Sequence, residues 1–260
     1  MNRFLLLSFH CFVLLLISCQ TSPTGRRQLL LVKDPEMNEM GTQAFAEMKK
    51  QTPIERGEAV NRYVNCIVQA ELAVTEDSTG VASWEVVVFK DSTPNAFALP
   101  GGKIGVHTGI LPVAKTPGQL AAVIGHEIGH VIARHGNERV SQNQITNGGM
   151  EALKTIGKGD MAGVLGAGAK FGVLLPYSRA HESEADYIGL EIMAKAGFNP
   201  EESVTLWENM SALGGSKSAE ILSTHPSDET RMTQLKSKMS DALQLFNSAK
   251  SQGKVPGCRL

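Results

Sequence analysis

The chain has 260 residues, 42% of them hydrophobic, and a formal net charge of -1 at pH 7. This many apolar side chains can build a substantial core, so wholesale disorder is excluded, and the length suits one sizeable domain or two small ones. The nearly balanced charge gives no support for a nucleic-acid-binding surface.

The N-terminus has the layout of a bacterial secretory signal peptide over residues 1–18. An arginine precedes an apolar run that is too short and wrongly flanked for a membrane-spanning helix. The run ends in Leu-Ile-Ser-Cys, which resembles a lipobox, the sequence at which a diacylglyceryl group is attached to cysteine. We therefore expect Cys19 to be the lipid-anchored first residue of the mature protein. The alternative is an ordinary cleaved signal with an incidental cysteine.

The residue after this cysteine bears on the location of the protein. Gln20, rather than an aspartate, favours the outer membrane in the sorting rule for such lipoproteins, with the chain on the periplasmic face. Residues 19–33 are then expected to form a lipid-anchored polar tether. Residues 34–250 are expected to form one folded domain, and residues 251–260 a C-terminal tail.

Helices are predicted from their caps, apolar periodicity and stop signals. Asp34 before Pro35 is typical of an N-cap and a first helical position, and Thr116 before Pro117 repeats this signal. Gly136 is the expected stop of the helix that Thr116 begins. The expected helices cover residues 34–50, 54–72, 117–135, 137–156 and 178–196, followed by one capped by residues 199–202 and one after Pro226.

Three short strands are expected before the helix at Thr116. Residues 86–89 are β-branched and aromatic, and residues 95–99 and 103–107 flank Pro-Gly-Gly, a strong turn signal. A Gly- and Ala-rich run at 158–175 fits either a flexible flap or a closely packed helix. Since helices dominate and one small sheet is expected, the predicted fold class is α+β.

Two cysteines remain besides the proposed anchor, Cys66 and Cys258. In an oxidising periplasm they could form a disulfide. The alternative is one buried thiol and one thiol in a frayed C-terminus, and the sequence leaves both open.

The stretch GHEIGHVIARH, residues 125–135, contains the pattern H-E-x-x-H. On a helix, His126 and His130 lie on one face about one turn apart, so both ring nitrogens can reach one metal ion. Glu127 lies one position round, where its carboxylate can take a proton from a water on that ion. Zinc suits this chemistry because it lowers the pKa of bound water toward ~7. The pattern also occurs on helices by chance, so a third ligand is decisive.

His135 is the first candidate for that ligand, but the spacing is wrong. The metzincin pattern H-E-x-x-H-x-x-G-x-x-H requires a glycine where Ala133 stands and a histidine where Gly136 stands. We therefore expect His135 to lie at the C-terminus of the helix and to interact with its dipole.

A better candidate lies on the helix predicted over residues 178–196. Glu182 and Asp186 are four residues apart, so Glu182 can bind the metal while Asp186 orients a ligand histidine. Glu184 and His181 point to other faces. A solvated acidic face is the alternative, but an acidic helix C-terminal to H-E-x-x-H is the layout of gluzincins. The predicted ligands of one zinc ion per chain are His126, His130 and Glu182.

These motifs, together with THPSDETR and NAFALPGGKIGVHTGIL, resemble the zinc metallopeptidases that include HtpX, the prenyl-protein CAAX proteases and the mitochondrial OMA-type proteases. The resemblance is closest to periplasmic lipoprotein members such as LoiP and BepA. It covers roughly residues 35–250, and the motifs occur in the order of the family. It implies a mostly helical zincin (gluzincin-like) metalloprotease domain.

The resemblance also implies roles for residues outside the ligand set. His225 of the motif H-P-x-x-x-x-R can occupy the open position of the zinc and hold the enzyme latent, and can assist catalysis when displaced; the alternative is a loop histidine before a helix. Arg231 could steady that loop or a substrate carbonyl, or be a surface cation. In zincins an edge strand beside the cleft pairs with extended substrate, and Asn95, Ala96 and Phe97 occupy that place.

The leading expectation is a zinc-dependent endopeptidase of the bacterial cell envelope, with Glu127, Asp186 and His225 as its catalytic groups. Backbone pairing gives affinity with little side-chain selectivity, so misfolded or misassembled envelope polypeptides are the expected substrates. The rival is a latent or non-hydrolytic zinc lipoprotein that acts as a chaperone or assembly module, with His225 closing the metal site.

Overall fold

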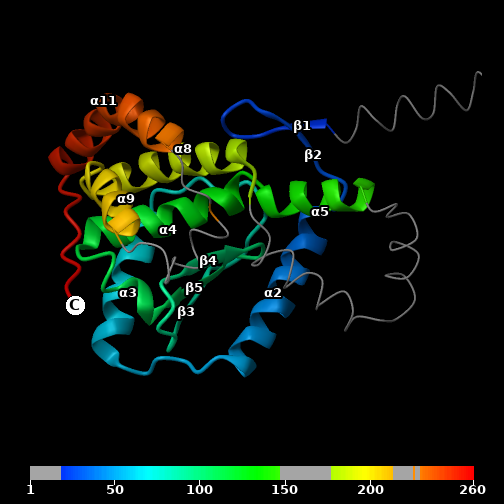
Figure 1. The fold of residues 1–260 in the computed structure, drawn as a ribbon, viewed down its shortest axis with the longest axis horizontal. Coiled ribbons are helices and arrows are strands. Elements are labelled where there is room, and N and C mark those ends of the chain that lie inside the picture. Colours follow the sequence, from blue (N-terminus) through cyan, green and yellow to red (C-terminus); the bar gives the residue numbers. More distant parts are fainter. Residues whose placement is uncertain (1–18, 147–176, 213–224, 226–228) are drawn as a thin grey trace, which may run out of the picture.

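The computed structural model describes residues 19–146, 177–212, 225 and 229–260 (Figure 1). Its elements are β1 (Cys19–Thr21), β2 (Arg27–Leu29), α2 (Asp34–Gln51), α3 (Glu58–Leu72), β3 (Glu85–Phe89), β4 (Ala96–Leu99), β5 (Lys103–His107), the 3-10 helix η1 (Thr108–Ile110), α4 (Pro117–Ile132), α5 (His135–Thr146), α8 (Arg179–Lys195), α9 (Glu202–Ala212) and α11 (Glu229–Ser251). The expected signal peptide, the run at 158–175 and Pro226 lie outside the described residues. Helices dominate, so the α+β prediction is confirmed.

The described strands form two small sheets, one more than expected. In the three-stranded sheet β5 is central, parallel to β3 and antiparallel to β4. The β4–β5 turn uses Gly101 and Gly102 at φ of 81° and 69°, which a glycine adopts without steric cost. Strand β4 lies at the edge of this sheet and packs against α4, so it lies beside the H-E-x-x-H helix.

Helix α4 runs through the middle of the fold, between the sheet and α8 (Figure 1). The hydroxyl of Thr116 begins it by accepting a hydrogen bond from the N–H of Gln119 at 3.1 Å. From Gly118 to Ile132 every residue except Ala122 is buried, as expected for a helix that is covered on all sides. Its histidines therefore face the protein interior.

Helix α4 ends at Ile132, so the expected stop at Gly136 was wrong. Arg134 instead takes a left-handed φ of 55°, and α5 begins at the next residue. Its guanidinium is held by Asp34, with Nε–Oδ1 and Nη2–Oδ2 distances of 3.0 and 2.9 Å. A non-glycine residue rarely adopts this conformation unless its surroundings fix it, and here a tertiary ion pair does so.

Other boundaries differ from the prediction by a few residues. Helix α2 is capped by Lys33 rather than by Asp34. Helix α3 begins at Glu58 because Ile54, expected at its start, forms an isolated antiparallel bridge with Phe89. Pairing of the preceding segment with the sheet thus outweighs its helical propensity.

Residues 19–33 do not form the expected polar tether. Strands β1 and β2 pair as an antiparallel ribbon in which Ser22 and Gln28 are buried. The side chain of Asn137 donates to the carbonyl of Val32 at 2.6 Å, which fastens the end of the segment to α5. The N-terminal ribbon, residues 19–33, is thus part of the fold.

The C-terminal segment 251–260 is also attached rather than free. Cys258 is 4% exposed, and its sulfur is bonded to that of Cys66 on α3 in a disulfide with an S–S distance of 2.01 Å. This is the pairing that the sequence left open. It joins segments 192 residues apart, and closing so long a loop restricts the unfolded chain.

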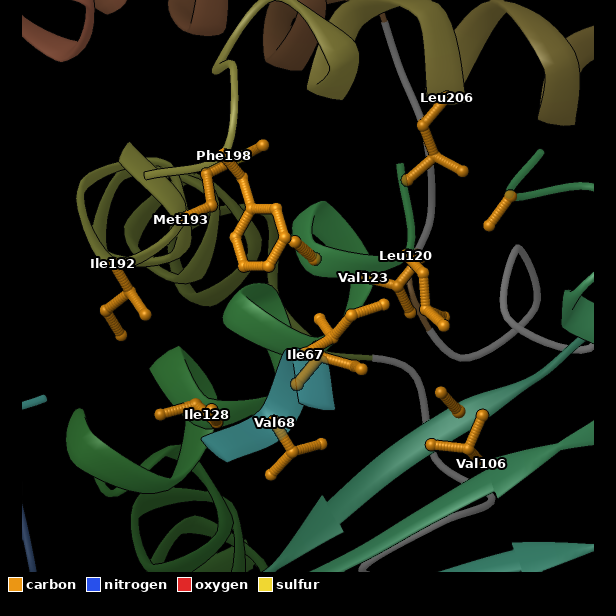
Figure 2. Close-up of a cluster of buried hydrophobic side chains, with 14 of the residues drawn as sticks. Ile67, Val68, Val106, Leu120, Val123, Ile128, Ile192, Met193, Phe198 and Leu206 are labelled. Atoms are coloured by element: carbon orange, nitrogen blue, oxygen red, sulfur yellow. The ribbon is translucent and has the colours of Figure 1, made fainter. Parts of the chain in front are cut away.

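The main hydrophobic core lies where α3, α4, α8 and the sheet meet (Figure 2). Figure 2 labels Ile67, Val68, Val106, Leu120, Val123, Ile128, Ile192, Met193, Phe198 and Leu206. These side chains anchor α4 from several directions, which fixes the position of the motif that it carries.

Helices α4 and α8 approach each other through residues without large side chains. A Cβ added to Gly125 would lie 2.9 Å from the carbonyl oxygen of Gly189, and one added to Gly129 would lie 2.9 Å from that of Ala185. A Cβ on Gly189 would lie 2.6 Å from the backbone nitrogen of His126. These glycines allow the two backbones to touch, so short side chains can meet between the helices.

We expect Gly189→Ala to lower the free energy of unfolding by about 1–3 kcal/mol, because the added methyl group has to push α8 away from α4. Chemical denaturation measures this loss. Gly257→Ala is the matched control, since a Cβ at Gly257 meets nothing within 4 Å. Equal stability of the two variants would show that the helices are not in close contact at this point.

Candidate metal centre

Two histidines of α4 and one glutamate of α8 converge inside the protein. The Nε2 atoms of His126 and His130 are 3.0 Å apart. The carboxylate oxygens of Glu182 lie 3.5 Å from each of these nitrogens. The glycine contacts between α4 and α8 bring these groups together, because they let side chains one turn apart on each helix meet at one point.

A third imidazole completes the group. The Nδ1 atom of His225 lies 3.2 Å from Nε2 of His126 and 3.1 Å from Oε1 of Glu182. Ligand atoms from His126, His130, Glu182 and His225 all lie within 4.8 Å of one another, and all four residues are buried. The structure therefore brings together the three residues predicted as ligands and the histidine predicted to close the site.

The donor set fits a metal ion. Asp186 can only accept, so Nδ1 of His126 donates to its Oδ1 at 2.9 Å, and Nε2 is the nitrogen that carries the lone pair in the neutral ring. Nε2 of His130 faces this lone pair at 3.0 Å, and two lone pairs at that distance repel unless a cation, either a proton or a metal ion, lies between them. Imidazole nitrogens with one carboxylate are a ligand set that zinc favours.

The charges around the centre also favour a bound cation. Burial alone would lower the pKa of His126, but hydrogen bonds to Asp186 and Glu182 outweigh burial and raise it to about 10. Burial lowers the pKa of His130 well below its usual value. Burial opposes ionisation of Glu182, yet its hydrogen bonds to the histidines hold its pKa far below the ordinary range. An ionised Glu182 thus stabilises positive charge at this point.

Asp186 and Arg231 support the candidate ligands from outside the cluster. Asp186 orients His126, as its spacing suggested, and receives Nε and Nη2 of Arg231 at 2.6 and 2.7 Å. Nη1 of Arg231 lies 2.6 Å from Oε2 of Glu182. Arg231 is 2% exposed, so the alternative of a surface cation is excluded. One arginine therefore holds both a candidate ligand, Glu182, and the partner of another, His126.

Glu127 lies next to the cluster without being one of its ligands. It is 2% exposed, and its Oε1 has no hydrogen-bond partner among the described residues. Burial raises the pKa of Glu127. The backbone N–H of Ala98 on β4 donates to its carboxylate, and Nε2 of His225 lies 3.5 Å away. A buried carboxylate in which one oxygen has no hydrogen-bond donor is suited to accept a proton.

The edge strand β4 presents backbone groups on the side of the sheet where Glu127 lies. The carbonyl of Asn95 accepts from the N–H of His107 on β5, and Phe97 lies opposite Gly105. The backbone groups of Asn95 and Phe97 are therefore directed toward β5. Ala96 and Ala98 alternate with them and direct their backbone groups away from β5. Of the three residues 95–97 expected to pair with substrate, only Ala96 therefore directs its backbone N–H and C=O to the open edge of the sheet. Ala98, which the prediction omitted, also does so and contacts Glu127.

His135 was assigned the wrong role. It does not end α4 but begins α5, is fully buried, and places its Nδ1 2.9 Å from Nδ1 of His130. Its Nε2 lies 3.1 Å from Oε2 of Glu184. The left-handed Arg134 causes the difference, since it breaks the helical spacing and turns the His135 ring back toward His130.

The surroundings of His130 were not predicted from the sequence. The ring of Tyr177 stacks on that of His130 at a centroid distance of 3.9 Å. His181 and Glu184, which were expected on other faces of α8, are both buried. Nε2 of His181 lies 3.1 Å from the carboxylate of Glu138 on α5. Helical spacing gives the face of a residue but not which distant segment covers that face.

Comparison with known proteins identifies the family. The sequence profile of "Peptidase family M48" matches residues 58–239, and the chain belongs to this family. It is 40% identical over 183 residues to a "Mitochondrial metalloendopeptidase OMA1" of Schizosaccharomyces pombe, covering 69% of this chain and 53% of that protein. It is 32% identical over 245 residues to "Metalloendopeptidase OMA1, mitochondrial" of Bos taurus, covering 87% and 47%.

A bacterial relative is more distant. The chain is 26% identical over 213 residues to a "Beta-barrel assembly-enhancing protease" of Escherichia coli O157:H7, covering 77% of this chain and 43% of that protein. The chain thus spans about half the length of the curated relatives that it matches. The resemblance to the OMA-type and BepA-type metallopeptidases is confirmed.

We expect Glu182→Gln to lower zinc affinity by about 10-fold or more, because it removes the anionic ligand from a buried cluster of imidazoles. Competition with a chromogenic chelator measures the affinity. Glu191→Gln is the matched control, since it makes the same change on the same helix, where Glu191 pairs with Lys195. Equal affinity of the two variants would show that Glu182 is not a ligand.

Proposed function

We propose that this member of peptidase family M48 is a zinc-dependent endopeptidase of the bacterial cell envelope. The observation that carries the proposal is the convergence of His126, His130 and Glu182 with Glu127 beside them and the edge of β4 next to Glu127. Metal ligands, a proton acceptor and a strand edge that can pair with a peptide are the parts that metal-assisted peptide hydrolysis requires.

Each of these residues has a distinct task in the proposed reaction. His126, His130 and Glu182 would hold one zinc ion, which when bound polarises the scissile carbonyl and lowers the pKa of the attacking water. Glu127 takes the proton of that water and delivers it to the leaving amine nitrogen. Burial raises the pKa of Glu127 toward the working pH, which favours both transfers.

The substrate strand would add to the edge of β4. A peptide that pairs with the outward backbone groups of Ala96 and Ala98 would lie beside Glu127, whose carboxylate already accepts from Ala98. Such pairing uses main-chain groups and therefore requires an extended, unfolded substrate. Misfolded or misassembled envelope polypeptides meet this requirement.

The location in the envelope is inferred from residues 1–19. The lipobox-like sequence favours a lipid anchor on Cys19, on the periplasmic face of the outer membrane, and one relative is named for β-barrel assembly. The OMA1 relatives are mitochondrial by name, so the family alone is compatible with either location. Among the described helices, none combines the length and the apolar character that a membrane span needs.

A second candidate function follows from the position of His225. With its ring 3.1–3.2 Å from Glu182 and His126, His225 can act as a fourth ligand, and a metal site closed by protein ligands does no chemistry. The chain would then be latent, or a non-hydrolytic assembly module. We favour the latent peptidase, because Glu127 and the strand edge have no use in a purely structural site.

Glu127→Gln is expected to keep bound zinc but to lower the cleavage of unfolded casein by about two to four orders of magnitude, because an amide cannot accept the proton. Metal content by mass spectrometry and a casein assay test this. The matched control is Glu191→Gln, which leaves the centre unchanged. Cleavage by Glu127→Gln at the wild-type rate would overturn the proposed reaction.

His225→Ala is expected to raise the casein cleavage rate by about tenfold, as for a protein whose open form is on the order of a tenth of the population. Zinc affinity in this variant should fall by less than in Glu182→Gln, because the anionic ligand Glu182 remains. Activity in His225→Ala alone would indicate a gated peptidase. Zinc binding without activity in both wild type and His225→Ala would favour the assembly module.

A further inference from the structure

The N-terminal ribbon places an arginine in contact with both α5 and α8. The guanidinium of Arg26 contacts Glu138 of α5 through Nη1 and Nη2, at 2.8 and 2.7 Å. Its Nε contacts Oε2 of Glu184 on α8 at 2.7 Å. Both glutamate side chains are at most 6% exposed, so the carboxylates of these ion pairs are largely removed from solvent, while the Arg26 side chain is 26% exposed. Arg26, in the N-terminal ribbon, thus connects α5 to α8 through ion pairs.

A chain of contacts leads from Arg26 to the metal centre. Oε2 of Glu184, which receives Nε of Arg26, also lies 3.1 Å from Nε2 of His135. Nδ1 of His135 lies 2.9 Å from Nδ1 of His130. The path therefore runs from Arg26 through Glu184 and His135 to the ring nitrogen of His130 that faces away from His126.

The chemistry of these groups fixes the direction of every hydrogen bond in the path. A carboxylate paired with an arginine only accepts, so Nε2 of His135 donates to Glu184. In the neutral His135 ring Nδ1 is then an acceptor, and Nδ1–H of His130 donates to it. Nε2 of His130 is left with a lone pair, and this is the atom that faces His126 and Glu182.

Further contacts hold the path in place. The rings of His135 and His181 stack at a centroid distance of 4.4 Å, and His181 contacts the same Glu138 that Arg26 binds. The buried side chain of Gln28, also in the ribbon, donates to Glu138 and to the carbonyl of Ala133. These hydrogen bonds and the ring stacking thus involve the ribbon, α5 and α8 together.

We propose that the N-terminal ribbon is a positioning element of the metal centre, in which Arg26 orients the ligand His130 through Glu184 and His135. The inference rests on the proposed function, because it gives His130 the role of a ligand. It makes metal affinity depend on a segment outside the matched family region, residues 58–239. Detaching the ribbon would free His135 to turn, and the tautomer and orientation of His130 would no longer be fixed.

The test compares Arg26→Ala with Arg27→Ala. Arg27 is exposed, lies in the same ribbon, and its loss changes the net charge equally. We expect Arg26→Ala to weaken zinc binding by about 10–100-fold, the usual effect of removing a group that orients a ligand, and Arg27→Ala to bind as wild type. Chelator competition at 25 °C gives the affinities, and circular dichroism establishes that both variants are folded at that temperature.

A merely structural role for Arg26 would lower the unfolding temperature but leave the zinc affinity of the folded chain unchanged, and that result would overturn the inference. If Arg26→Ala does not fold, Arg26→Lys replaces it. Its single ammonium keeps the charge but cannot contact both glutamates as the guanidinium does. Arg26→Lys should bind zinc more weakly than wild type, and equal affinity would overturn the inference.

Failure of this inference is distinguishable from failure of the proposed function. Wild-type chain that binds no stoichiometric zinc, or Glu182→Gln that binds it unchanged, would overturn the function and the inference together. Loss of affinity in Glu182→Gln with full affinity in Arg26→Ala would overturn the inference alone.

Discussion

The close approach of α4 and α8 is the constraint on which the rest of the structure depends. Gly125, Gly129 and Gly189 let the two backbones touch, and only at that separation can the short side chain of Asp186 reach a histidine on the facing helix. Hydrophobic packing against α3, the sheet and α9 stabilises the contact between α4 and α8 (Figures 1 and 2). The candidate metal centre is therefore a product of helix packing, and the close-packed core around it holds its geometry.

Buried ionisable groups are costly, and their arrangement explains why this protein keeps so many. Burying an ion pair gains little stability by itself, while leaving one partner unpaired is strongly unfavourable. Here each of the two α4 histidines has a path that ends on an arginine: His126 through Asp186 to Arg231, and His130 through His135 and Glu184 to Arg26. Both paths direct Nε2 lone pairs to one point. Such an arrangement is of little use to stability and is well suited to holding a cation.

The parts of the site that follow helical spacing were predictable, and the parts that depend on distant chain segments were not. The spacing of His126 and His130, and of Glu182 and Asp186, gave the correct faces because α4 and α8 are regular where these residues lie. His135 was misassigned because the left-handed Arg134 interrupts that regularity. Arg26 was not considered because its partners Glu138 and Glu184 are separated from it by 112 and 158 residues. No periodicity in the sequence connects groups so far apart.

The cluster is held least firmly at His225. Arg231 holds Asp186 and Glu182 at 2.6–2.7 Å, and Arg26 holds the path to His130 at a similar distance. Glu182 and the groups that orient His126 and His130 are therefore fixed by charged partners. The contacts of His225 in the centre are longer, 3.1–3.5 Å, and are made to residues that keep other partners. Displacing His225 would therefore leave the orientation of His126, His130 and Glu182 unchanged, while it would vacate the space next to Glu127. His225 is thus the member of the cluster whose departure would disturb the other three least.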